Sequence, residues 1–109
     1  VAKHEFTLSL GPAKESLGIS AMDVAKGLLD MGYMAPTVYF PLVVPECMMI
    51  EPTETESKAT LDEFAKKFIQ VLALDAETLH EAPLTTPVRR VDEVHAARNL
   101  WLRHDGVDR

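Results

Sequence analysis

The histidines and the cysteine are the first residues of this chain to weigh as chemical groups. Zinc sites need closely spaced ligands such as H-x-x-x-H or paired cysteines, and the sequence contains neither pattern. Cys47 follows Glu46, whose negative charge does not favour a reactive thiolate, so we interpret it as a passive thiol in a loop. Three histidines fall on or near polar helix faces and are interpreted as surface residues: His80, His95 and His104. His4, which opens the first expected strand, remains a candidate.

An acidic run covers residues 51–56, EPTETE. Glu51, Glu54 and Glu56 could bind a cation, but the run lacks the glycine and the alternating Asp/Asn ligands of a calcium loop. Thr53 and Glu56 have the spacing of a capping box, and the acidic charges suit the positive end of a helix. We therefore predict that a helix begins here.

A basic pair, Arg89-Arg90, follows the sequence TTP at residues 85–87. Arginines in such a loop could hold a phosphate or a carboxylate. We interpret the segment instead as a solvated connector, with Asp92 and Glu93 offsetting the pair. The sequence contains no glycine-rich loop, serine elbow or paired catalytic carboxylates, so the residues alone indicate no active site.

Length and charge narrow the class of protein. The 109 residues (12.1 kDa) form one domain at most. A net charge of −6 argues against a nucleic-acid footprint, which needs clustered Lys and Arg. No apolar run reaches the ~18 residues of a membrane span, no signal peptide is visible, and one cysteine suggests a reducing compartment. Because the chain begins at Val1 without Met, we expect an excised piece of a larger protein.

The first half of the chain predicts strands around one helix. Residues 4–10 alternate between apolar and polar side chains, as in a half-buried strand, and the Gly-Pro pair at 11–12 ends it. Ser20 is expected to cap a helix over about residues 20–31, with Asp23 in its first turn. Residues 37–40 and 48–51 are expected to form a hairpin whose loop carries Pro41 and Pro45.

The second half predicts three helices. A stripe with helical spacing marks the longest one and consists of Leu61, Phe64, Ala65, Phe68, Ile69 and Leu72. Asp75 should cap a short helix through about Glu81, and Asp92 a last helix through about Arg103. The predicted fold class is α/β, or more closely an α+β two-layer domain. It has a small antiparallel sheet of about three strands with helices on one face. Residues 1–103 form this single domain, and residues 104–109 a frayed tail.

Several motifs resemble one family in their order along the chain. They are HEFTLSL, SAMDVAKGLLDMGY, PTVYFPLVVPECMMIEPTETES, TLDEF and APLTTPVRRVDEVHAAR. Together they resemble the C-terminal region of glycine dehydrogenase (decarboxylating) subunit 2, the P-protein of the glycine cleavage system. The resemblance covers about residues 4–103. Two departures are Leu84, where the family usually has a histidine before TTP, and a longer, more polar ending. Because Leu84 replaces that histidine, the resemblance does not support a role near the active site for the loop that contains TTP.

The resemblance implies a pyridoxal phosphate (PLP) enzyme of the aspartate aminotransferase fold. Such an enzyme decarboxylates glycine and transfers the aminomethyl group to the lipoyl arm of the H-protein. The cofactor lysine of the family lies upstream of the region similar to this chain, so no catalytic, cofactor-binding or metal residue is carried over. We expect PLP in the parent enzyme and none bound to this piece, which should be inactive alone. The alternative is a free-standing α/β interaction or regulatory module.

The resemblance also implies partners and a place in the cell. Expected partners are the remainder of the P-protein, its other subunit and the lipoyl H-protein, with no nucleic acid and no membrane. The piece itself is expected to dimerise through an exposed apolar face. The compartment would be the bacterial cytoplasm, or the mitochondrial matrix in a eukaryote. Residues expected at the cleft or the subunit contact are His4, Tyr39, Glu51, Thr53 and Glu54.

Overall fold

The structure is a computed structural model that describes residues 4–104 and 106. Its elements along the chain are β1 (Phe6–Ser9), α1 (Gly11–Leu17), α2 (Ala21–Asp30), β2 (Thr37–Val38), β3 (Cys47–Ile50), α3 (Lys58–Leu72), α4 (Ala76–Glu81) and α5 (Glu93–Arg98). Among the described residues, no helix has the length and apolar character that a bilayer span requires. The expected frayed tail lies mostly outside the described residues, since 105 and 107–109 are not among them.

The strands of the described chain form one three-stranded antiparallel sheet in the order β1-β3-β2. Leu8 lies opposite Met48, and Thr37 opposite Met49. The predicted small antiparallel sheet is therefore confirmed, including the pairing of β2 with β3. The prediction of a strand over residues 37–40 was too long, because Tyr39 has a φ of 60° and turns the chain out of the ladder.

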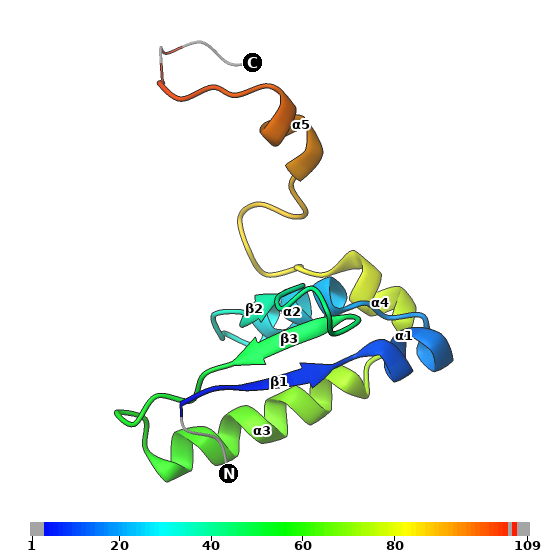
Figure 1. Cartoon of the computed structure of the whole chain (residues 1–109), viewed down its shortest axis with the longest axis vertical. Helices are drawn as coiled ribbons and strands as arrows, with labels where there is room; N and C mark the ends of the chain where they lie inside the picture. The colour runs from blue at the N-terminus through cyan, green and yellow to red at the C-terminus, as the bar shows by residue number, and fades with distance from the viewer. Residues whose placement is uncertain (1–3, 105, 107–109) are drawn as a thin grey trace.

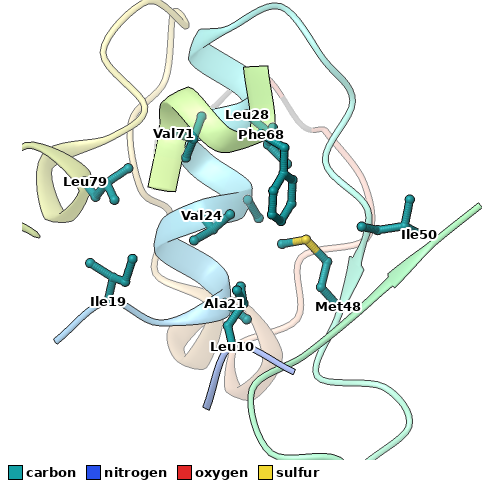
Figure 2. Packing of buried hydrophobic residues seen from close by; sticks show 11 residues of the cluster. Leu10, Ile19, Ala21, Val24, Leu28, Met48, Ile50, Phe68, Val71 and Leu79 are labelled. Atoms are coloured by element: carbon teal, nitrogen blue, oxygen red, sulfur yellow. The ribbon is translucent and has the colours of Figure 1, made fainter. Parts of the chain in front are cut away.

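Helices pack against the sheet through the side chains that alternate on β3. Met48 and Ile50 point toward α2 and α3, where they join Val24, Leu28 and Phe68 in the core (Figure 2). Burying an apolar side chain of this size stabilises the fold by about 1.5–3 kcal/mol, so this cluster is the main source of stability. Figure 1 shows α3 running along the sheet, as the predicted two-layer domain requires.

Cys47 differs from its predicted place in a loop. It is the first residue of β3 and is fully buried, opposite Ser9 of β1. The hairpin loop ends one residue earlier, at Glu46, because the Tyr39 N–H donates to the Cys47 carbonyl at 2.8 Å and closes the hairpin there. The thiol is thus a small core side chain.

Helix α1 was missed by the sequence analysis. Proline can occupy the first turn of a helix, where its missing N–H is not needed, so the Gly-Pro pair that ends β1 also begins α1. The helix ends at Gly18, whose φ of 72° is favourable for glycine. The predicted capping of α2 is confirmed, because Ser20 and Asp23 form a reciprocal capping box.

The predicted start of α3 and end of α5 were wrong. Ser57, and not Thr53, caps α3: its hydroxyl accepts a hydrogen bond from the Thr60 N–H at 3.1 Å. Residues 53–56 form a turn whose Thr53 and Thr55 hydroxyls bond each other at 2.9 Å. Helix α5 ends at Arg98 and does not continue to Arg103.

The chain leaves the folded body after Arg90, whose side chain still contacts α2. We call residues 88–104 the C-terminal arm; it contains α5 and extends away from the sheet and the other helices (Figure 1). The Cα radius of gyration is 15.9 Å, whereas a compact domain of this length has about 13 Å. The arm accounts for this excess in Figure 1.

Candidate functional site

A groove of about 480 Å³ lies between the end of β3, the loop before β2 and the start of α3. Its apolar lining comes from side chains that include Met34, Met49, Leu61 and Phe64. Three carboxylates also line it: Glu5, Glu51 and Glu56. None of the described residues in this lining is Lys, Arg or His, so the groove suits neutral or cationic groups better than anions.

The sequence-predicted site residues are only partly brought together. Glu51 lines the groove with Glu5, and the His4 Nε2 lies 3.5 Å from the Glu5 carboxylate. Thr53 and Glu54 are exposed in the turn before α3 and do not line the groove. Tyr39 lies at the start of the hairpin loop and does not line it either.

The hairpin loop around Tyr39 has a defined anchor. Tyr39 and Glu46 both have positive φ values, of 60° and 49°. Glu46 reaches across to α1 and α2: one carboxylate oxygen lies 2.7 Å from the Lys14 Nζ, and the other accepts from the Ala21 N–H at 2.7 Å. The tip between them presents exposed apolar side chains, namely Phe40, Leu42 and Val43.

The electrostatics of Glu46 match this anchoring role. Burial alone would raise the pKa of its carboxyl, but hydrogen bonds from the Ala21 N–H and the Lys14 ammonium outweigh it and lower the pKa. The position at the first turn of α2 also places the negative charge near the positive helix end. Sequence reasoning considered Glu46 only as a neighbour of Cys47 and missed this contact.

The segment 82–91 is mostly exposed, as predicted for a solvated connector, but side chains of α2 also hold it in place. Arg90 lies 2.9 Å from the nearly buried Asp23 carboxylate. It also donates to the carbonyls of Leu79 and Ala82. Arg89 pairs with Glu81 at 2.9 Å. The basic pair is therefore neutralised from α2 and α4, and Asp92 instead caps α5.

Asp30 forms the second anchor of this segment. Its carboxylate accepts from the backbone N–H groups of Leu84 and Thr85 and from the Thr85 hydroxyl, at 2.7–2.9 Å. Burial would raise the pKa of Asp30, but these hydrogen bonds outweigh it and the pKa is lowered. Sequence reasoning did not select Asp30. The sequence did offer one signal: an acidic residue at a helix C-terminus is disfavoured by the helix dipole, which suggests that another contact stabilises it.

The described residues do not fit a PLP or metal site. Among them, no group of three or more His, Cys, Asp or Glu side chains could hold a metal ion. Lys14 and Lys58 form surface ion pairs, and none of the lysines in the described range lines the groove. The groove also lacks a cation for a phosphate group. Lys3 lies outside the described residues.

Comparison with known proteins places this arrangement in a family. A protein-family model described as "Glycine dehydrogenase, C-terminal domain" matches residues 1–88. Similar proteins named "Probable glycine dehydrogenase (decarboxylating) subunit 2" come from Nitrosospira multiformis and Thiobacillus denitrificans. Each is 54% identical to this chain, over 104 and 107 residues.

A Bacillus cereus protein of the same name is also 54% identical, over 106 residues. These matches cover 93–94% of this chain and 21–22% of the relatives. The chain thus spans about one fifth of the length of the curated relatives it matches. Because the family model covers most of its residues and the sequence resemblance agrees with it, the chain belongs to the glycine dehydrogenase C-terminal domain family.

Proposed function

We propose that this chain is the C-terminal domain of a PLP-dependent glycine dehydrogenase (decarboxylating) and that its contribution is structural. The similarity to subunit 2 proteins over nearly the whole chain carries this proposal. In the complete enzyme, glycine would lose its carboxyl group as CO2, and the aminomethyl group would pass to the lipoyl arm of the H-protein. The proposed surroundings are the bacterial cytoplasm, or the mitochondrial matrix in a eukaryote.

The lysines support a structural contribution for the domain. A PLP enzyme needs a lysine in a prepared pocket and a cationic cradle for the phosphate. Lys66 is exposed, and Lys26 and Lys67 are half-buried on α2 and α3, outside the groove. We propose that the remainder of the polypeptide and its other subunit supply the coenzyme site. Residues 1–103 would form one supporting domain beside it.

The experiment uses the complete polypeptide that carries this domain, with its other subunit and H-protein. We expect glycine-dependent CO2 release and the absorbance of bound PLP from that assembly. The 109-residue chain with added PLP should give neither. A covalent PLP complex of the short chain, or CO2 release from it, would overturn the structural assignment. Absence of both signals from the complete assembly would overturn the enzyme assignment.

A finer proposal concerns the groove and its neighbours. Glu51 and the adjacent His4 and Glu5 would face the active-site cleft or the subunit contact, with Thr53 and Glu54 in the turn that follows. Tyr39 would reach such a contact from the hairpin loop, near the other end of β3. Replacing Glu51 with Ala in the complete enzyme should reduce glycine decarboxylation. Glu77→Ala on the exposed face of α4 is a control expected to leave it unchanged. Equal activity of the Glu51→Ala and Glu77→Ala enzymes would show that the groove does not form part of the active-site cleft.

A further inference from the structure

The C-terminal arm carries apolar side chains in solvent. Val88, Val91 and Val94 are 59–63% exposed, and Leu100 and Leu102 are 72% and 85% exposed. These five residues lie within fifteen positions of each other, on a segment that extends away from the body (Figure 1). Single exposed apolar residues are ordinary on a protein surface, but a concentrated set usually marks a contact with another surface.

Side-chain contacts attach the base of the arm to the body, but the helix beyond them has no such contacts to stabilise it among those described. Arg90 fixes the base to Asp23 and to the carbonyls at the end of α4. Beyond it, α5 has six residues and a side-chain cap from Asp92. Isolated helices shorter than about 12 residues are marginal in water. Such a helix, with its valine exposed, needs a surface to pack on.

The comparisons point to the surface that the arm packs on. The family model ends at residue 88 of 109, whereas the relatives match 93–94% of the chain. Their similarity must therefore extend into the arm. The same relatives have about four fifths of their length outside the matched region. A covalently attached surface is present at an effective concentration in the millimolar range, so it competes well against a second copy of the domain.

We propose that the apolar residues of the arm dock on the remaining four fifths of the same subunit 2-type polypeptide and fasten the C-terminal domain to it. This inference rests on the proposed function only in so far as it takes the chain to be part of such a polypeptide. The partner surface is apolar, to match the arm's valines and leucines. The arm then links two parts of the polypeptide. Arg90 attaches its base to the C-terminal domain, and its valines and leucines contact the rest of the subunit.

Hydrogen exchange on the 109-residue chain and on the complete polypeptide tests the docking. The amides of Ala96 and Asn99 bond to carbonyls within the arm. In the short chain we expect them to exchange within about 10-fold of unstructured rates, because α5 opens easily. In the complete polypeptide we expect exchange at least about 100-fold slower. Equal rates in the two proteins would overturn the proposal.

A matched pair of variants identifies the side chains responsible. In the complete polypeptide, the double change Leu100→Ser with Leu102→Ser should make the Ala96 and Asn99 amides exchange at least about 10-fold faster. Arg98→Gln, a polar change on the same arm, should leave the exchange rates of these amides unchanged. Neither change should alter the thermal unfolding midpoint of the short chain. Equal loss of protection in the two variants would show that the leucines do not carry the contact.

Two further measurements separate the alternatives. Sedimentation of the short chain over a range of concentrations tests a second copy as the occupant. Arm protection that grows with dimer formation would overturn the proposal in favour of that copy. PLP absorbance and CO2 release, measured on the same complete polypeptide together with its other subunit and H-protein, report the proposed function independently. A protected arm without either signal would uphold the docking and refute the enzyme assignment.

Discussion

At the scale of single residues, three carboxylates hold distant segments together. Asp23 binds Arg90, Asp30 binds the backbone at Leu84 and Thr85, and Glu46 binds Lys14 and the start of α2. For each, burial opposes ionisation but hydrogen bonds and nearby cations prevail, so the pKa is lowered. These carboxylates are therefore needed in their charged form.

The lowered pKa values predict the pH dependence of stability. Carboxyls in the unfolded chain titrate at about pH 4. As the pH falls, the unfolded chain therefore takes up protons at a higher pH than the folded chain does. The free energy of unfolding should be level above about pH 5 and should fall progressively below about pH 4. Urea titrations at a series of pH values measure it. Asp30→Asn should make the acid decline shallower, and a rise in stability on acidification would contradict the assignment.

Arg90 provides the test of the anchored segment. Replacing it with Met removes the guanidinium partner of the nearly buried Asp23 and leaves only the longer 3.5 Å contact with His80, which should lower the free energy of unfolding by about 1–3 kcal/mol. Arg89→Met is the matched control. Its partner Glu81 is mostly exposed, and exposed pairs contribute about 0–1 kcal/mol. Equal effects in denaturant titrations would show that the Asp23 contact is not the anchor.

At the scale of the elements, the start of α3 distinguishes two candidate caps. Ser57 accepts the Thr60 N–H, whereas Thr53 bonds only within the preceding turn among the contacts seen. Ser57→Ala should lower the free energy of unfolding by about 1 kcal/mol. Thr53→Ala should change it by less than about 0.5 kcal/mol. Chemical denaturation of both variants decides between them, and a larger loss at Thr53 would support the capping box first predicted from the sequence.

The close approach of α2 to α3 and α4 depends on Gly27. A Cβ built at this position would lie 2.7 Å from Val71 Cγ1 and 2.9 Å from Leu79 Cδ2, and both side chains are fully buried. Although alanine favours a helix over glycine by about 1 kcal/mol, overpacking costs about 1–3 kcal/mol. Gly27→Ala should therefore destabilise the protein.

Thermal and urea unfolding measure the effect of Gly27→Ala. The double variant Gly27→Ala with Val71→Ala offers the control, because removing the two valine methyls opens space for the new methyl group. The two changes together should cost less than the sum of the single changes. Strict additivity would show that Gly27 and Val71 do not limit the helix spacing.

At the scale of the whole molecule, the body and the arm should be separable. Ending the chain after Val91 keeps Arg90 and removes α5 and the exposed leucines. The Cα radius of gyration should fall from 15.9 Å to about 12 Å. The free energy of unfolding should stay within about 0.5 kcal/mol. Small-angle scattering and urea titration measure both, and a large loss of stability would show that the arm supports the body.

Much of the body could be predicted because its signals are local. The alternation in β1, the capping box of Ser20 and Asp23, and the apolar stripe of α3 depend on residues only a few positions apart. Such patterns specify an element wherever it lies in the fold. The start of α1 was missed because the Gly-Pro pair suits both the end of a strand and the first turn of a helix.

By itself the sequence determined the elements of the body other than α1, the antiparallel sheet and the family. The tertiary structure decided which groups meet. Asp30 binds Leu84 from 54 positions away, Arg90 turns inward to Asp23, and of the predicted site residues only Glu51 lines the groove. The physical reason is that periodicity and capping act within one or two turns. An ion pair or a close helix approach depends on how distant segments pack, which no local pattern encodes.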